Sequence, residues 1–295
     1  MNPLISVIIP TYNRADLLPQ AIMSVLKQTY TKLECIVVDD ASIDETEHVV
    51  NQFADNRIVY IRHETNRHVS VSRNTGIAHT KGDLIGFLDD DDEWLPTKLE
   101  KQISFIKILP TNVGLIYCWM DYYDNQGQLM KEHHPTYRGD VFPYVLDRQR
   151  IGGTPTLLVR RSVIENVGGF DEELLRGNDG DFIRRVCREY EVDFVPEVLV
   201  KVHIGHGHER ITRSDAQGIK NAIKGQSIKL VKFKNELNKY PKQTSNIYAN
   251  IAYHYSQLRD LKNSIAFYWK AFKTYPSSTR IYINLLRSLK AQILS

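Results

Sequence analysis

The most informative stretch of this chain is Leu84-Ile85-Gly86-Phe87-Leu88-Asp89-Asp90-Asp91-Asp92. A short apolar run is typical of a buried strand, and this one ends in four adjacent carboxylates. Adjacent negative charges repel one another, so we expect a bound cation to compensate them. Carboxylate oxygens suit Mg²⁺ or Mn²⁺, which also bind phosphate oxygens. Open α/β sheets bind ligands at the carboxyl ends of their strands, so the position favours a metal-diphosphate site over a solvated acidic turn.

Strand and helix patterns alternate around this stretch over the first 110 residues or so. The predicted strands cover residues 6–10, 34–40, 57–63 and 83–89. The predicted helices cover residues 16–28, 44–53 and 70–80, and a further helix opens at Pro96. This alternation indicates an α/β fold with a mostly parallel sheet flanked by helices. The pattern is less regular from 113 to 211, where strands at 113–120, 156–159 and 198–204 and a helix at 179–190 are expected.

The bulk composition is that of a soluble globular protein, with 295 residues, 42% of them hydrophobic and 25% charged. No apolar run approaches the ~18 residues of a membrane-spanning helix. The N-terminus lacks the features of a signal peptide, so we expect a cytoplasmic protein. The three cysteines, Cys35, Cys118 and Cys187, are predicted to be buried free thiols.

Charge divides the chain into two parts. Residues 215–295 hold 14 Lys and Arg against 3 Asp and Glu, a net charge of +11, whereas residues 1–214 carry a net charge of −8. The basic part is predicted to be helical, which gives an α/β domain over 1–215 and a small all-α region over 216–295. Within it, residues 245–276 resemble one tetratricopeptide helix pair, the alternative being a generic helical hairpin.

Three motifs accompany the acidic run. They are the strand and polar turn Ser6–Arg14, the strand with two terminal acids Val37–Ser42, and the segment Asn66–Gly76. With the acidic run, and in this order, they resemble the family 2 inverting glycosyltransferases over roughly residues 4–210. The resemblance implies the GT-A fold, a Rossmann-like mixed sheet that binds a nucleotide-sugar.

The first implication concerns the nucleotide. Pro10 and Tyr12 belong to the turn that binds it, and the Tyr12 ring can stack on a pyrimidine unless it is only a packed strand-end tyrosine. Asp40 can accept the imide N–H of uracil or thymine, and Asp39 can reach the ribose hydroxyls. Both acids can instead complement a helix N-terminus. Arg73 is expected at the diphosphate or the base edge, with a structural salt bridge as the alternative.

The second implication concerns the metal. Asp89 and Asp91 correspond to the family's Asp-x-Asp, and Asp91 is the expected direct ligand of Mn²⁺ or Mg²⁺. Asp89 and Asp90 are expected to hold ribose or metal-bound water. His203 follows the last predicted strand in a histidine-rich stretch, and we expect it to be the metal ligand if one of these histidines binds; the alternative is a plain surface loop.

The third implication concerns the acceptor. Gly168–Glu172 resembles the family's acceptor-side loop, and Asp179 aligns with the general base, with Asn178 in place of the usual glutamate. A helix N-cap is the alternative role for Asp179, and Asp181 is the rival base. His68 stands where relatives often carry glycine, which puts the shape of that loop in question.

Together these features predict a metal-dependent, inverting hexosyl- or N-acetylhexosaminyl-transferase. It would move a sugar from a nucleotide diphosphate-sugar, most reasonably a UDP-sugar, to a hydroxyl of a glycan or lipid-linked glycan in surface polysaccharide synthesis. The alternatives are donor hydrolysis and a non-catalytic scaffold that recruits partners through its helical tail. The basic helices suggest peripheral contact with the inner membrane face, a single exposed repeat is compatible with a homo-oligomer, and no nucleic-acid motif is present.

Overall fold

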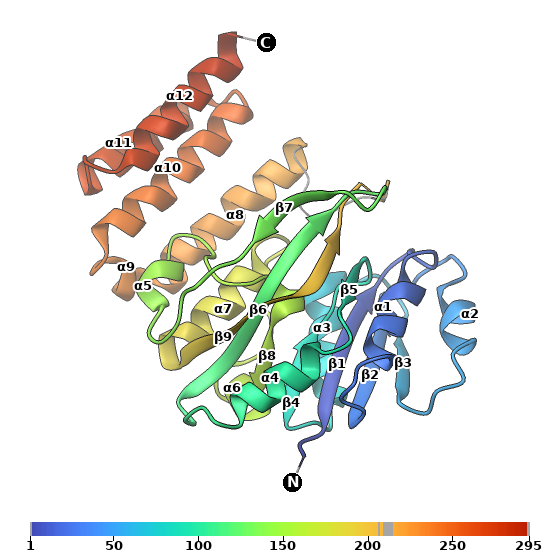
Figure 1. Cartoon of the computed structure of the whole chain (residues 1–295). Helices are drawn as coiled ribbons and strands as arrows, with labels where there is room; N and C mark the ends of the chain where they lie inside the picture. The colour runs from blue at the N-terminus through green and yellow to red at the C-terminus, as the bar shows by residue number, and fades with distance from the viewer. Residues whose placement is uncertain (1, 206, 209–214, 294–295) are drawn as a thin grey trace. The chain divides into compact units, whose positions relative to one another are not determined.

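A nine-stranded mixed sheet forms the centre of the fold in the computed structural model, which describes residues 2–205, 207–208 and 215–293 (Figure 1). Along the sheet the strand order is β3-β2-β1-β4-β8-β6-β9-β5, and β7 pairs with β6. The strands are β1 (Ile5–Thr11), β2 (Leu33–Asp39), β3 (Ile58–Arg62), β4 (Leu84–Phe87), β5 (Asp92–Trp94), β6 (Val113–Tyr123), β7 (Leu129–His133), β8 (Leu158–Arg160) and β9 (Glu191–His203).

The first four strands run parallel to one another. Strand β1 lies between β2 and β4, and β3 adds to the outer side of β2. The connections are helices α1 (Leu18–Leu26), α2 (Thr46–Asn51) and α3 (His68–His79). Every residue of β1 and β2 is buried, as expected for strands with helices on both faces. Because parallel strands end at one edge, the three motifs and the acidic run meet there.

The other strands give the sheet its mixed character. Strand β8 is antiparallel to β4, β6 is antiparallel to β8, and β9 runs parallel to β6. The residues after the acidic run were expected to enter a helix directly, but they first form the short strand β5, antiparallel to β9. Helix α4 (Lys98–Ile106) follows. The buried Trp94 indole N–H donates to the Pro155 carbonyl at 2.8 Å and fixes this strand over the sheet.

The remaining short elements of this region are α5 (Phe142–Val145), the 3₁₀ turn η1 (Thr154–Thr156) and α6 (Arg161–Val167). The predicted α/β class, with a mixed sheet, flanking helices and a helical C-terminal region, is confirmed. Cys35, Cys118 and Cys187 are buried free thiols, also as predicted.

The chain divides into two compact units. Unit 1 comprises Met1–Val145, Gln149–Glu172 and Phe182–His208, and unit 2 comprises Leu146–Arg148, Glu173–Asp181 and Glu209–Ser295. Helix α7 (Asn178–Glu189) begins in unit 2 and continues in unit 1. The boundary predicted at 215/216 adjoins residues 209–214, which lie outside the described residues.

Unit 2 is mainly helical. Its helices are α8 (Ala216–Lys232), α9 (Lys234–Leu237), α10 (Pro241–Gln257), α11 (Leu261–Thr274) and α12 (Thr279–Ile293). Helices α10, α11 and α12 lie alongside one another (Figure 1). Buried serines link α11 to α10, since the Ser264 hydroxyl donates to the Ala252 carbonyl at 2.9 Å and Ser245 to the Ala271 carbonyl at 2.8 Å. Within the described ranges, no helix is both long and apolar enough to cross a membrane.

Candidate functional site

Two arginines pair with the acidic run that follows β4. Arg14, from the turn after β1, places its Nη1 2.7 Å from an oxygen of Asp90 and 3.1 Å from an oxygen of Asp91. Arg73, from α3, places its Nη2 2.7 Å from Oδ1 of Asp89. The run is therefore compensated in part by the protein itself. The compensation by these two arginines was not predicted from the sequence.

Burial dominates the electrostatics of this cluster. Asp90 is 5% exposed, and burial raises its pKa to about 6; Arg14 opposes the rise and the neighbouring Asp91 adds to it. Burial also disfavours the charged guanidinium of Arg14, but the carboxylates of Asp90 and Asp91 outweigh this and raise its pKa. Two guanidinium groups, those of Arg14 and Arg73, thus pair with three carboxylates. The carboxylates outnumber the guanidinium groups, and their hard oxygen atoms suit a divalent cation.

The protein alone does not enclose such a cation. Among the described residues, no group of three or more His, Cys, Asp or Glu side chains could hold a metal ion. His203 lies at the end of β9, with its Nε2 3.2 Å from Gln20 and 3.6 Å from a carboxylate oxygen of Glu93. Asp89, Asp91 and His203 therefore do not form a complete ligand cage, and a cation held by the aspartates would need further oxygens from a ligand such as a diphosphate.

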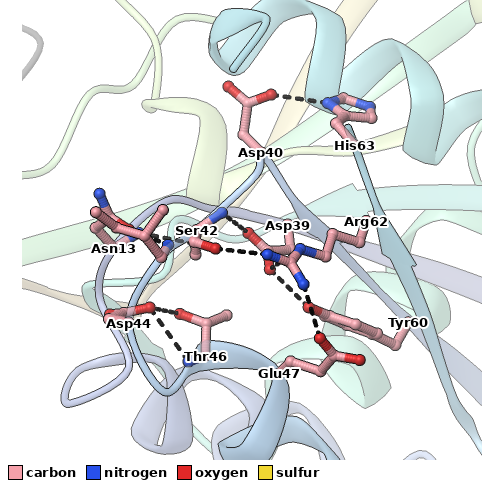
Figure 2. Close-up of polar contacts among 11 residues, drawn as sticks. Asn13, Asp39, Asp40, Ser42, Asp44, Thr46, Glu47, Tyr60, Arg62 and His63 are labelled. Atoms are coloured by element: carbon pink, nitrogen blue, oxygen red, sulfur yellow. Dashed lines mark hydrogen bonds and ion pairs between the residues drawn. The ribbon is translucent and has the colours of Figure 1, made fainter. Parts of the chain in front are cut away.

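Asp39 and Asp40, at the end of β2, form hydrogen bonds with different neighbouring segments (Figure 2). Asp39 is 1% exposed and accepts from the Ser42 amide at 2.8 Å and from the Tyr60 hydroxyl at 2.6 Å. Burial and this hydrogen bond raise the pKa of Tyr60. Asp39 therefore fixes the loop after β2 to strand β3.

Asp40 ties the same strand end to helix α3. It accepts from His63 Nδ1 at 2.7 Å, from the Arg67 amide at 2.9 Å and from the His68 amide at 2.8 Å. His68 has φ 69°, in the left-handed region that favours glycine. The loop therefore has a backbone conformation that suits glycine, although histidine occupies it here.

The turn after β1 lies against this loop. Parallel pairing sets Pro10 beside Val38 and Thr11 beside Asp39. The Asn13 side chain accepts from the Ile43 amide at 2.8 Å and locks the two turns together. Tyr12 remains 45% exposed. A fixed backbone thus presents an aromatic ring to solvent beside the ends of β1 and β2, which is how a stacking platform for a base would be built.

The third motif holds the loop Gly168–Glu172 through Asn74. Asn74 Oδ1 accepts from the Phe170 amide at 2.7 Å, and its Nδ2 donates to the Phe170 carbonyl at 2.8 Å. A Cβ on Gly169 would lie 2.3 Å from Asn74 Oδ1, so the close approach requires glycine. The Arg73 guanidinium lies 5.0 Å from the centroid of the Phe170 ring. One turn of α3 therefore contacts both the acidic run and this loop.

Asp179 stands at the start of α7, in the part of that helix that belongs to unit 2. Its amide donates to the Asn178 side chain at 2.8 Å, a contact between neighbouring residues of the first turn of α7. The rival Asp181 is 2% exposed and forms an ion pair with Lys232 at 2.8 Å, also within unit 2. This ion pair gives Asp181 a structural role within unit 2.

Sequence reasoning missed three residues of this arrangement. Arg14 was visible as the last residue of the first motif, but nothing in the pattern showed that it reaches the acidic run 76 positions away. His63, which bonds Asp40, and Lys232, which pairs with Asp181, carried no signal at all. All three partner a predicted acid, so a search for basic side chains and hydrogen-bond donors to pair with the buried carboxylates is the signal that could have found them.

Solved structures identify the class of fold. The chain matches TarS 1–349 of S. aureus, solved with UDP-GlcNAc, with a TM-score of 0.66, 17% identity, and coverage of 92% of this chain and 81% of that chain. It also matches the mannosyltransferase PcManGT of Pyrobaculum calidifontis, solved with GDP-Man and Mn²⁺, with a TM-score of 0.61 at 19% identity, covering 100% of this chain and 81% of that chain. The fold is thus that of the GT-A glycosyltransferases.

Sequence relatives identify the family. Residues 6–168 match Glycosyl transferase family 2, and the chain belongs to this family. WcaA of Escherichia coli K12, named as a glycosyl transferase of colanic acid biosynthesis, is 32% identical over 72% of this chain and 77% of its own length. WfgD of Escherichia coli, named a UDP-Glc:alpha-D-GlcNAc-diphosphoundecaprenol beta-1,3-glucosyltransferase, is 41% identical over 39% of this chain and 44% of its own length. Three uncharacterized glycosyltransferases of Rickettsia and Haemophilus influenzae are matched over 63–64% of their own length.

Proposed function

We propose that this chain transfers a hexosyl or N-acetylhexosaminyl group, with inversion, from a UDP-sugar to a hydroxyl of a glycan or lipid-linked glycan. The observation that carries the proposal is the acidic run Asp89–Asp92 at the end of β4, paired with Arg14 and Arg73, in a chain of family 2. It lies at the carboxyl edge where β1 and β2 also end, which is where open α/β sheets bind nucleotides.

The donor nucleotide is bound by the residues of this edge. Tyr12 stacks on the uracil through its exposed ring. Asp39 and Asp40 already accept two and three protein hydrogen bonds, and a carboxylate has about four acceptor positions, so each retains capacity for a ligand. Asp40 then accepts the imide N–H and Asp39 a ribose hydroxyl. Arg73, which pairs with Asp89, is proposed to contact the diphosphate.

Asp91, with Asp89 beside it, is the proposed site of Mn²⁺ or Mg²⁺, and Asp90 supports ribose or metal-bound water. When bound, the cation neutralises charge that develops on the diphosphate leaving group. His203 is proposed as a further contact for the cation, from the end of β9. Arg14 partners two of these carboxylates and keeps their repulsion low before the donor enters.

Asp179 is the proposed general base. The acceptor oxygen forms a bond to the anomeric carbon while the bond from that carbon to the diphosphate oxygen breaks, and the hydroxyl proton passes to Asp179. A single in-line displacement of this kind inverts the anomeric configuration. The proton lost by the acceptor hydroxyl is therefore held by the Asp179 carboxylate, and the leaving group departs as UDP.

The acceptor class rests on the named relatives. WfgD is named for transfer from UDP-Glc to a diphosphoundecaprenol-linked sugar, and WcaA for colanic acid biosynthesis. We infer by analogy that this chain works in surface polysaccharide synthesis on a lipid-linked acceptor. Residues 216–295 are proposed as a separate helical region, with a tetratricopeptide-like pair over 245–276 formed by α10 and α11.

Calorimetric titration of UDP tests the donor site. UDP is expected to bind with Mn²⁺, to lose at least about tenfold in affinity in EDTA, and to lose a similar factor in Asp91→Ala. Glu197→Ala, which removes a surface ion pair with Lys101, is the matched control and should bind like the native chain. Equal binding with and without metal would exclude the metal role. No binding under any condition would exclude uridine and direct the search to thymidine and guanosine donors.

The products test the reaction. Incubation with a UDP-sugar and a lipid-linked acceptor should give a glycosylated lipid, with little free sugar in the absence of acceptor. Free sugar released at the same rate with or without acceptor would show donor hydrolysis instead of transfer.

A further inference from the structure

Helix α11 carries a stripe of large apolar side chains on its outer surface. Leu261, Ile265, Trp269 and Phe272 are 51%, 68%, 56% and 41% exposed. Their spacing of four, four and three residues places them on one side of the helix. The Trp269 and Phe272 rings lie stacked, with centroids 5.9 Å apart and planes 9° from parallel. An exposed stripe of this size is uncommon on a protein surface that has no partner.

Helix α12 carries a second stripe. Its exposed apolar residues, each between 40% and 67% exposed, are Tyr282, Ile283, Leu285, Leu286 and Leu289. The two helices meet where the Tyr268 hydroxyl lies 2.9 Å from the Ser288 hydroxyl and where Ile281 packs on Ala271. In each helix, some residues of the stripe lie one helical turn away from the residues of this contact. We call the two stripes together the α11–α12 face; it lies entirely within unit 2.

The charge around this face is mainly positive. Residues 259–293 contain seven Lys and Arg and one acidic residue, Asp260, which caps the N-terminus of α11. Lys262 and Lys273 lie beside the α11 stripe by helical spacing, and Lys273 Nζ is 5.0 Å from the centroid of the Trp269 ring. Such lysines can lay their methylene stems along an apolar surface and extend their ammonium groups toward a negative one.

We propose that the α11–α12 face binds the surface of an anionic phospholipid bilayer. Trp, Phe, Leu and Ile on one face with Lys alongside is the composition of a helix that lies in the membrane interface. A second copy of this chain would bring together two faces that each carry seven basic residues and one acidic residue, Asp260, over residues 259–293, so the net like charges would repel. An anionic headgroup layer supplies the opposite charge, and the acyl region beneath it accepts the apolar side chains.

This inference rests on unit 2 alone and does not use the proposed sugar transfer. Co-sedimentation of the full chain with vesicles tests it. The chain should bind vesicles of equal parts phosphatidylcholine and phosphatidylglycerol at least about tenfold more tightly than vesicles of phosphatidylcholine alone. The double variant Trp269→Ser/Phe272→Ser should lose at least about tenfold of that binding.

Matched variants separate the two parts of the face. Lys262→Glu/Lys273→Glu should abolish the preference for phosphatidylglycerol, and Leu286→Ser should weaken binding from the α12 side. Val231→Ser, on α8 and 78% exposed outside the face, should bind like the native chain. Every substituted apolar side chain is at least 41% exposed, and circular dichroism and titration of UDP should show the same fold and donor binding in each variant.

Three results would overturn the proposal. One is the absence of vesicle binding by the native chain, and another is equal binding by the native chain and the Trp269→Ser/Phe272→Ser variant. The third is a dimer in light scattering that Trp269→Ser/Phe272→Ser converts to monomer, because this would assign the face to a second copy. A failed donor titration with intact vesicle binding would remove the proposed function and leave this one standing.

Discussion

The carboxyl edge of β1, β2 and β4 and the α11–α12 face are opposite in charge and in the state of their side chains. At the edge, acidic residues such as Asp39, Asp40 and Asp90 are buried and have named partners in the chain. On the face, large apolar side chains such as Trp269 and Leu286 stand 56% and 67% exposed among lysines and arginines. The first region is preorganised by internal bonds, whereas the second exposes the groups that another surface would cover.

The difference in burial between the two regions indicates what each can bind. Buried carboxylates held by arginines and backbone amides keep a fixed geometry, which is what selective binding of a small polar ligand requires. Exposed apolar and basic side chains have no such geometry, and they suit a partner that is soft and negatively charged. The two regions are therefore expected to respond differently to similar substitutions.

The largest expected effect is on catalysis, from Asp179→Asn. If Asp179 is the general base, this change lowers kcat by about 10²–10⁴, because the amide cannot take a proton, and leaves UDP affinity unchanged. Steady-state kinetics with a UDP-sugar and calorimetry with UDP measure the two quantities. Asp181→Asn is the comparison, since Asp181 pairs with Lys232. Its main effect should be a lower free energy of unfolding and not a lower kcat. A larger loss of kcat in Asp181→Asn would reverse the assignment.

The contrast in burial is tested by the same substitution in the core of unit 1 and on the α11–α12 face. Leu18→Ala, at a fully buried leucine of α1, should cost about 2–5 kcal/mol of unfolding free energy through lost burial and a cavity. Leu286→Ala, on the α11–α12 face, should change it by less than about 0.5 kcal/mol. Urea unfolding measures both. Equal losses would show that the α12 stripe is covered in the isolated chain.

The preorganisation of the edge is tested at Gly169. Gly169→Ala should lower the unfolding free energy by about 1–3 kcal/mol, because its Cβ would meet Asn74 Oδ1 at 2.3 Å and displace the Asn74–Phe170 bonds. Gly153→Ala is the matched control: its Cβ would meet the flexible end of Met120 at 3.2 Å. Thermal unfolding of both variants measures this loss. Equal losses in the two variants would mean that the Asn74 contact does not require glycine at position 169.

The smallest expected effect concerns a buried lysine at the start of α4. Lys98 is fully buried, with its Nζ 3.7 Å from the centroid of the Trp94 ring, and burial lowers its pKa from 10.5 to about 8. The unfolded chain therefore binds more protons between pH 8 and 10.5, so the stability of the native chain relative to Lys98→Met should rise with pH in this window.

The expected gain between pH 7.5 and pH 9.5 is about 1–2 kcal/mol. Urea unfolding of both chains at the two pH values measures it. Lys98→Met also leaves Gln102 Oε1 without the Lys98 hydrogen bond, but this cost does not depend on pH and cancels in the comparison. A difference that stays constant with pH would show that Lys98 is not perturbed.

Local patterns were sufficient for most of the sheet. The predicted strand at 34–40 is β2 (Leu33–Asp39), and the predicted helix at 179–190 is α7 (Asn178–Glu189), each within one residue at both ends. Apolar runs and capping residues determine such elements over short distances. The strands β5 (Asp92–Trp94) and β7 (Leu129–His133) were missed, because β5 is short and forms by pairing with β9, and β7 is largely exposed and pairs with β6.

The α/β class, the acidic run after β4 and the separation of an acidic from a basic part could all be predicted without a structure, since each is a local pattern or a sum of charges. The pairing of Arg14 and Arg73 with that run, the ion pair of Lys232 with Asp181 and the exposure of Trp269 on α11 became known from the folded chain. These features depend on residues that lie far apart in the sequence. Contacts between residues far apart depend on how strands and helices pack, and no periodicity or composition encodes which cation meets which carboxylate.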